Sequence, residues 1–187
     1  FVNQININMS KTLIIHPKDD STTFLDIVYK DVPNQTLIQG GISKLEMMKL
    51  IESHDRVMMM GHGSPNGLFH VGQFFHCGPT YGGYIIDETM VSLLKEKDNS
   101  VFIWCNADQF VNKHSLKGFY SGMFISETAE AKICGLSEAT QKSVDVSNNN
   151  FSEILSSVMD KSSESMFKAA KNRYGVTAKY NNVARFN

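Results

Sequence analysis

Two short apolar segments of this chain each end at a side chain that can take part in acyl transfer. The run Met58-Met59-Met60 is followed by Gly61-His62-Gly63, and Val101-Phe102-Ile103-Trp104 is followed by Cys105. An imidazole can act as a general base, and a thiolate is a strong nucleophile. The pair therefore has the chemistry of a cysteine hydrolase, provided that the fold brings the two segments together.

Each segment also has a purely structural interpretation. His62 could be a loop histidine between two turn glycines, and Cys105 could be buried, since a free cysteine packs like a small apolar residue. The glycines allow a sharp turn and leave backbone N–H groups accessible, as an oxyanion site requires. The separation of the two segments leaves room for one crossover helix. A right-handed crossover between adjacent parallel strands would bring both residues to the same edge of a sheet.

Short apolar runs alternate with amphipathic segments, which predicts an α/β fold with a mostly parallel sheet between two layers of helices. We expect strands at 12–15, 36–38, 56–60, 101–105 and 119–126, and half of a hairpin at 67–72. We expect helices at 21–30 with Ser21 as N-cap, 43–53 with a Ser43–Glu46 capping box, 87–95, from 128, and 151–174 with a break near 161–163. The polar segment 137–150 is expected to be an exposed connection, open to proteolytic processing.

Composition narrows the class of protein. The 187 residues include 42% hydrophobic and 20% charged residues, typical of a globular domain, which we assign to 9–187, with 1–8 as upstream or added residues. The net charge of −1 gives no basic excess for nucleic acid. We find neither an apolar run of the roughly 20 residues that span a membrane nor a secretory signal. Three cysteines argue against a disulfide scaffold and favour the cytoplasm.

A metal or cofactor site is not expected. His70, His76 and Cys77 could join His62, but their spacing fits no standard zinc pattern. The glycine pairs at 40–41 and 82–83 match neither phosphate-binding loop and are interpreted as turns. We interpret the loop around His76, which is rich in Gly, Phe and Tyr, as a segment beside the cleft.

The His-Gly and Cys segments together resemble the caspase-like (clan CD) cysteine peptidases, such as caspases, legumains, gingipains and clostripains. In these enzymes an apolar strand ends in His-Gly, and a later apolar strand ends in the nucleophilic cysteine. The resemblance covers residues 11–135 and implies a caspase-like three-layer α/β sandwich. It implies that Cys105 is the nucleophile, that His62 is the general base and acid, and that the N–H groups of Gly63 and Cys105 form the oxyanion hole. A peptide or protein substrate would be hydrolysed through a thioacyl-enzyme intermediate.

The sequence departs from this family around the cysteine. Cys105 is flanked by Ile-Trp and Asn-Ala, not by the Gln-Ala and Arg-Gly of caspases, so cleavage after Asp is not expected. Ile103 stands where clostripains and separases often have an acidic residue, so a pocket for a basic substrate residue is not supported at that position. Acidic alternatives are Asp19, Asp20, Asp108 and Glu127, and the substrate preference stays open. The resemblance makes Asp108, Ser121, Gly122 and Glu127 candidates for substrate binding.

Two other classes of function remain open. A caspase-like module could keep the His–Cys pair and serve only to bind a partner. A flavodoxin-like or receiver-like domain could carry both residues incidentally, but a receiver needs an Asp where His62 follows the third strand. Rapid labelling of Cys105 by an acyl electrophile would favour the peptidase. The sequence leaves the oligomeric state open.

Overall fold

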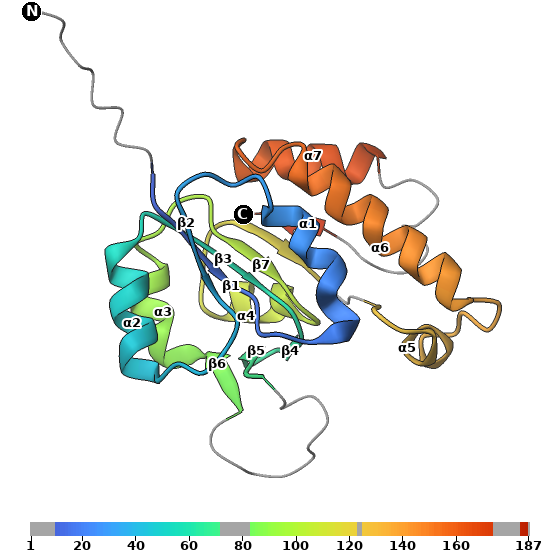
Figure 1. The fold of residues 1–187 in the computed structure, drawn as a ribbon, viewed down its shortest axis with the longest axis horizontal. Coiled ribbons are helices and arrows are strands. Elements are labelled where there is room, and N and C mark those ends of the chain that lie inside the picture. Colours follow the sequence, from blue (N-terminus) through green and yellow to red (C-terminus); the bar gives the residue numbers. More distant parts are fainter. Residues whose placement is uncertain (1–9, 72–82, 123–124, 174–183, 187) are drawn as a thin grey trace, which may run out of the picture.

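The central element is a sheet with the strand order β2-β1-β3-β7-β8-β9 (Figure 1). The computed structural model of the chain describes residues 10–71, 83–122, 125–173 and 184–186. The first five strands in this order are parallel and β9 is antiparallel to β8. Their bounds are β1 (Thr12–Ile15), β2 (Gln35–Ile38), β3 (Arg56–Met60), β7 (Val101–Ile103), β8 (Phe119–Ser121) and β9 (Ala184–Phe186).

Helices cover both faces of this sheet, which confirms the predicted α/β class. The α2 face carries α2 (Lys44–Ser53), η2 (Glu88–Met90), α3 (Val91–Leu94) and α4 (Ala107–Lys113). The α6 face carries η1 (Asp20–Leu25), α1 (Asp26–Tyr29), α6 (Gln141–Ser156) and α7 (Ser163–Arg173). The short helix α5 (Thr128–Ile133) adjoins α6 (Figure 1). The arrangement has three layers.

Strand residues alternate between the two layers of helices. Met59 packs on the α2 face, whereas Met58 and Met60 pack on the α6 face, and all three are fully buried. Burial on both faces explains why these strands are continuous apolar runs instead of alternating patterns. The same alternation fixes which face receives the side chains that follow each strand.

A small antiparallel sheet follows β3 at its carboxyl end. It consists of β4 (Gly63–Ser64), β5 (Gly67–Phe69) and β6 (Tyr84–Ile86), in that order. The hairpin predicted near residue 67 is therefore confirmed. Its first strand begins immediately after His62, so this histidine lies in the two-residue link between β3 and β4.

Three predictions about elements were wrong. Residues 137–140 are a connection as predicted, but 141–150 are not, because α6 begins at Gln141 with a Thr140–Ser143 capping box and buries Val144, Ser147 and Asn148. A hydrogen-bonded helix is a poor site for proteolytic processing. The first helical segment is capped by Asp19, not by Ser21. The strand expected at 119–126 ends at Ser121.

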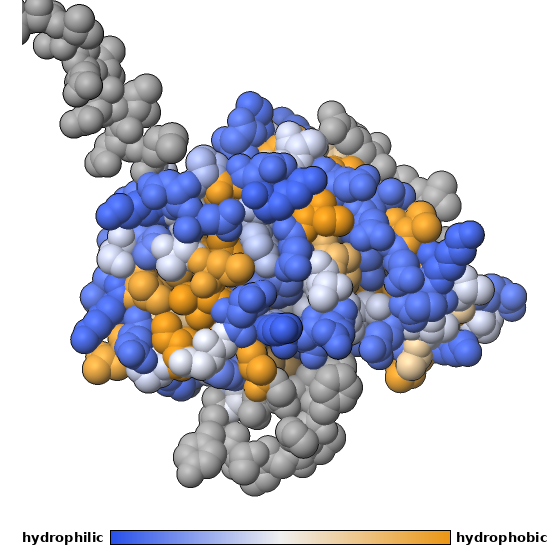
Figure 2. Space-filling view, viewed as in Figure 1, coloured by the Kyte–Doolittle hydropathy of each residue, from blue (hydrophilic) through white to orange (hydrophobic). Residues whose placement is uncertain are grey.

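The predicted α2 capping box between Ser43 and Glu46 is confirmed, as is the break between the last two helices. Apolar residues gather over β2 and α2 on the face seen in Figure 2, where Leu37 is 41% and Leu45 65% exposed. Among the described residues, no helix has the length and apolar character needed to span a bilayer.

Candidate functional site

The ends of β3 and β7 lie level with each other. Met60 is paired with Ile103, and the N–H of Gly61 donates a hydrogen bond of 3.0 Å to the carbonyl oxygen of Ile103. His62 and Cys105 each follow these paired residues by two positions. Successive side chains of a strand alternate between its two faces, so His62 and Cys105 are directed to the α6 face, as Met60 and Ile103 are. Cys105 is half-buried there and packs against the same apolar cluster as these two residues. The sheet thus brings the two reactive residues to one edge and one face.

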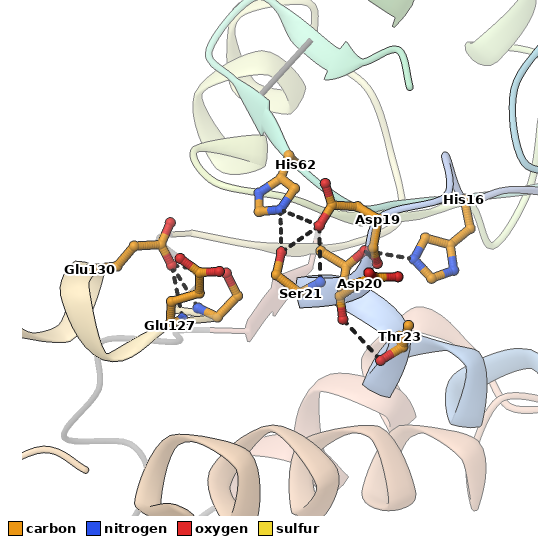
Figure 3. A network of polar contacts seen from close by, with 10 residues as sticks. His16, Asp19, Asp20, Ser21, Thr23, His62, Glu127 and Glu130 are labelled. Carbon is orange, nitrogen blue, oxygen red and sulfur yellow. Dashed lines mark hydrogen bonds and ion pairs between the residues drawn. The ribbon is translucent and has the colours of Figure 1, made fainter. Parts of the chain in front are cut away.

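The side chain of His62 is buried and is held by the segment that follows β1 (Figure 3). Its Nε2 lies 2.7 Å from Oγ of Ser21 and 3.5 Å from Oδ1 of Asp19. The same carboxylate oxygen accepts hydrogen bonds from the Ser21 hydroxyl at 2.7 Å and from the Ser21 N–H at 2.9 Å. These three residues form a network, the Asp19–Ser21–His62 network.

The network determines which nitrogen of the imidazole carries a proton. Burial of Asp19 opposes its ionisation, but hydrogen bonds from Ser21 and the nearby His62 together hold the pKa of Asp19 below its usual value. The ionised carboxylate takes the hydroxyl hydrogen of Ser21, so the Ser21 oxygen accepts from Nε2–H of His62. In the neutral ring, Nδ1 then carries the lone pair and is the basic atom.

Trp104 links the histidine segment to the cysteine segment. Its Nε1–H donates to the carbonyl oxygen of Ser64 at 3.0 Å. A Cβ atom added at Gly63 would lie 2.2 Å from Cδ1 of Trp104 and 2.7 Å from the carbonyl oxygen of Gly67. Only glycine leaves room for the indole here. The Gly63 of the His-Gly motif is therefore explained by close packing against the residue that precedes Cys105.

The turn after Cys105 is held by the strand next to it. Asn106 adopts a left-handed conformation with φ of 66°, and its N–H donates to the carbonyl oxygen of Gly122 at 3.1 Å. The hydroxyl of Ser121, which is buried, donates to the carbonyl oxygen of Trp104 at 3.1 Å. Ser121 and Gly122, predicted as substrate-binding residues, thus contact the backbone on either side of the cysteine. The amides of Gly63 and Cys105, predicted for the oxyanion hole, belong to the two segments that Trp104 joins.

A cavity of about 500 Å³ adjoins the Asp19–Ser21–His62 network on the α6 face. Ser21 belongs to its wall, and Glu127 is the predicted substrate-binding residue that lines it. Asp108 does not, because it lies in the first turn of α4, which packs on the α2 face. Asp145 and Asn148 of α6 also line the cavity and were missed by the sequence analysis. The sequence analysis expected both residues to be exposed; Asp145 is exposed, but Asn148 is only 2% exposed.

Another histidine supports the segment that carries Asp19 and Ser21. His16 follows β1 and is buried, with Nδ1 3.0 Å from the Tyr29 hydroxyl and Nε2 3.1 Å from Oγ1 of Thr22. Burial lowers the pKa of His16, and the charge of Asp26 and its hydrogen bond oppose this shift. The His16–Thr22 contact holds the start of η1 against the sheet edge.

No metal site is found within the described ranges, where no three His, Cys, Asp or Glu side chains are grouped to hold an ion. His76 and Cys77, considered above as ligands, lie outside the described residues. Comparison of the chain with protein-family models, with curated proteins and with solved structures found no match. Inference about its function therefore starts from the residues of this site.

Proposed function

We propose that this protein is a cysteine peptidase in which Cys105 attacks a peptide carbonyl and His62 transfers the proton. The observation that carries the proposal is the register of β3 and β7, which sets His62 and Cys105 level on one face of the sheet. The Asp19–Ser21–His62 network adds a defined tautomer of the base. The resemblance to caspase-like peptidases and the parallel sheet between helices agree with this proposal, and we extend it to a caspase-like architecture.

In the first half of the reaction, Nδ1 of His62 takes the proton of the Cys105 thiol, and the thiolate attacks the substrate carbonyl carbon. The carbonyl π electrons move onto oxygen and form a tetrahedral oxyanion. Backbone N–H groups of Gly63 and Cys105 would donate to that oxyanion, and one such donor contributes about 3 kcal/mol in known cases. The Ser21 oxygen, held by ionised Asp19, stabilises the imidazolium through Nε2–H.

Collapse of the tetrahedral species breaks the C–N bond, and the proton on Nδ1 of His62 goes to the leaving amine. A thioester on Cys105 remains. Water then loses a proton to His62 and attacks the thioester carbonyl, and the acid product leaves as the proton returns to the thiolate. The cycle consumes one water and needs neither a redox partner nor a cofactor. A reduced thiol is required, which agrees with a cytoplasmic location.

A serine hydrolase is a second candidate, because Oγ of Ser21 lies 2.7 Å from Nε2 of His62. A serine nucleophile must give its hydrogen to the histidine. Here the hydroxyl of Ser21 donates to Asp19 instead, which favours a supporting role for Ser21. The non-catalytic binding module remains the alternative from a different class.

Covalent labelling separates these functions. The full chain would be treated with a peptidyl acyloxymethyl ketone, a thiol-directed acyl electrophile, and with a fluorophosphonate, which labels serine nucleophiles; the labelled residue would be identified by mass spectrometry. We expect labelling at Cys105 by the ketone, with a rate that falls about 100-fold in His62→Ala. Cys134→Ala is the matched control, since Cys134 is the other free cysteine in the described part of the chain.

Each outcome assigns one class. Loss of ketone labelling in Cys105→Ala and its persistence in Cys134→Ala support the cysteine peptidase. Fluorophosphonate labelling at Ser21, abolished in Ser21→Ala, would assign the serine hydrolase. Equal slow labelling of Cys105 and Cys134, unchanged by His62→Ala, would indicate that the thiol is not activated and that the module only binds.

A further inference from the structure

His16 follows β1, and its buried imidazole connects α1 to the start of η1 (Figure 3). On one side of the ring, Nδ1 lies 3.0 Å from the Tyr29 hydroxyl and 3.2 Å from Oδ1 of Asp26. On the other side, Nε2 lies 3.1 Å from Oγ1 of Thr22, which is also buried. The mechanism proposed above gives this imidazole no part in the reaction.

The contacts at Nδ1 determine where the first proton of the ring lies. The Tyr29 hydroxyl donates its only hydrogen to Oδ1 of Asp26. Burial and this hydrogen bond raise the pKa of Tyr29, so the hydroxyl stays protonated. The Tyr29 oxygen therefore accepts from His16, and Nδ1 carries a hydrogen in both protonation states of the ring. The other nitrogen, Nε2, is the one that gains or loses a proton.

The hydroxyl of Thr22 has two acceptors within reach and only one hydrogen. Its Oγ1 lies 3.1 Å from Nε2 of His16 and 3.2 Å from the carbonyl oxygen of Asp19. When Nε2 carries a lone pair, the hydroxyl donates to it, because Thr22 is the donor that the described contacts place at this buried nitrogen. When Nε2 is protonated, it donates to Oγ1, and the hydrogen of Thr22 goes to the Asp19 carbonyl. The proton on His16 thus decides which group Thr22 holds.

Asp19 connects this hydroxyl to the histidine of the catalytic pair. Its carboxylate accepts from the N–H and the hydroxyl of Ser21 and lies 3.5 Å from Nε2 of His62. Its carbonyl oxygen accepts from the N–H of Thr22 at 3.1 Å. A hydrogen bond added or removed at this carbonyl therefore acts on the residue whose carboxylate orients His62. A proton on His16 also places a positive charge near His62, and positive charges on the two rings oppose each other.

We propose that His16 is a positioning residue for the base His62, and that it acts through the hydroxyl of Thr22 and the backbone of Asp19, the His16–Thr22–Asp19 link. This inference rests on the proposed peptidase function. Protonation of His16 turns the Thr22 hydroxyl to the Asp19 carbonyl and makes His62 a weaker base, so the acidic limb of the kcat–pH profile contains a second ionisation. The titratable groups that face His16 are Asp26 and Tyr29 of α1, Asp19 before η1 and His62 after β3.

The direction of the Thr22 hydroxyl can be followed without turnover. Full-length Cys105→Ala protein, labelled with 13C and 15N, would be titrated from about pH 8 to about pH 5, and the 13C shift of the Asp19 carbonyl compared with the ring signals of His16. We expect the carbonyl shift to follow protonation of His16, and this step to be absent in His16→Gln and in Thr22→Val. A carbonyl shift that stays constant while the His16 ring titrates, or a ring that does not titrate before the protein unfolds, overturns the inference.

The same turn of the chain provides a matched control. The hydroxyl of Thr23, which is exposed, donates to the carbonyl oxygen of Asp20 at 3.1 Å, one residue along from the Thr22–Asp19 contact. The Asp20 carbonyl shift should not follow His16, and Thr23→Val should leave the Asp19 step in place. Equal steps at both carbonyls would show that the whole segment responds to pH and would overturn the specific link through Thr22.

Turnover of a fluorogenic peptide library is the second arm. In His16→Gln the amide can accept from Thr22 and donate to Tyr29, as the neutral imidazole does, but it cannot be protonated. We expect kcat near pH 8 to change by less than about threefold, and the acidic limb to fall from a slope steeper than that of one ionisation to the slope of one. Thr22→Val should lower kcat about threefold with KM unchanged, and Thr22→Ser should restore it.

The two arms separate this inference from the proposed function. An Asp19 carbonyl that follows His16, together with the steeper acidic limb in wild type, supports both proposals. If the carbonyl follows His16 and no peptide is cleaved, the His16–Thr22–Asp19 link stands and the peptidase is overturned. Turnover with a constant Asp19 carbonyl shift, or with the same acidic slope in wild type and His16→Gln, overturns the link and leaves the peptidase intact.

Discussion

The two edges of the central sheet each hold a cavity, and the two cavities are nearly equal in volume, at about 510 Å³ and 500 Å³. The larger lies at the amino ends of β1 and β3 and is lined by Arg56 together with Asp31 and Asp160. The smaller lies at the carboxyl edge and is lined by carboxylates alone among its charged residues. Size therefore does not distinguish them, and their polar groups do.

At the amino edge the buried cation, Arg56, is satisfied within the chain. Nε of Arg56 donates to the carbonyl oxygen of Asn99 at 2.9 Å, and Nη1 donates to that of Met159 at 2.7 Å. Burial lowers the pKa of Arg56 to about 10, and Asp160 opposes this shift, so the side chain stays charged at neutral pH. At the carboxyl edge, by contrast, Oδ1 of Asn148 has no hydrogen-bond partner among the described residues, and Asp20, Glu127 and Asp145 form no ion pair there. A buried cation with its donors paired stabilises the fold, whereas carboxylates without a cationic partner contribute little to it.

Replacing Arg56 should have the largest effect on stability. Arg56→Met removes donors from two backbone carbonyl groups, and we expect the free energy of unfolding to fall by about 3 kcal/mol. Urea denaturation followed by circular dichroism measures this change. Turnover per folded molecule should be unchanged, because the substitution lies at the edge opposite His62 and Cys105.

Asp20→Asn is the matching substitution at the carboxyl edge. It should change the free energy of unfolding by less than about 0.5 kcal/mol, since Asp20 is exposed and forms no ion pair among the described residues. If Asp20→Asn were as destabilising as Arg56→Met, the two cavities would not differ in the way proposed.

The contact between Gly63 and Trp104 allows a second test at the carboxyl edge. Gly63→Ala places a Cβ atom 2.2 Å from Cδ1 of Trp104, so the His62 and Cys105 segments must separate. We expect a loss of about 2 kcal/mol in unfolding free energy and a drop in turnover of more than about tenfold. Gly135→Ala is the control: its φ of +84° strains any side chain, but its Cβ meets open space, so turnover should persist. Unchanged turnover in Gly63→Ala would show that this contact does not set the catalytic geometry.

The parallel strands of the central sheet could be predicted from the sequence alone, and so could the positions of His62 and Cys105 at its carboxyl edge. Apolar runs such as Met58-Met59-Met60 predicted parallel strands, because burial on both faces removes polar residues from them. The pairing of Met60 with Ile103 then placed His62 and Cys105 as expected. These parts of the fold depend on local apolar pattern and on a general rule of handedness.

The cavity could not be predicted in the same way. Its α6 wall includes Asp145 and Asn148, in a segment whose Ser and Asn content is typical of loops. The helix forms because Val144 and Phe151 are buried against the rest of the protein, which is a tertiary effect. The sequence is ambiguous at Ser21 as well. A serine before a helix predicts an N-cap, but here Asp19 is the N-cap. A polar residue that lines a cavity therefore cannot be told from an exposed residue by its type alone, before its packing is known.

In the proposed mechanism Ser21 and Asp19 position His62, and their replacement should have a smaller effect on turnover. Ser21→Ala and Asp19→Asn each disturb the bond that keeps the proton on Nε2. We expect kcat to fall about tenfold with little change in KM, and the acidic limb of the kcat–pH profile to shift. Ser21→Thr keeps the hydroxyl and should restore most of the activity. Complete loss of activity in Ser21→Ala, not rescued by Thr, would instead indicate a nucleophilic serine.

His16 should give the smallest effect, a difference in how stability depends on pH. Its pKa is lowered in the folded protein by burial, so between that pKa and the unfolded value of about 6.5 the unfolded chain binds more protons. The contribution of this group to stability must therefore fall as the pH drops below about 6.5. His16→Gln should flatten the dependence, measured as urea midpoints across this range. Asp26→Asn should steepen it, because the Asp26 carboxylate raises the His16 pKa and its removal lowers that pKa further. Parallel pH dependences in wild type and both variants would mean that the pKa of His16 does not change on folding, so that Asp26 and the Tyr29 hydroxyl fully offset the effect of burial.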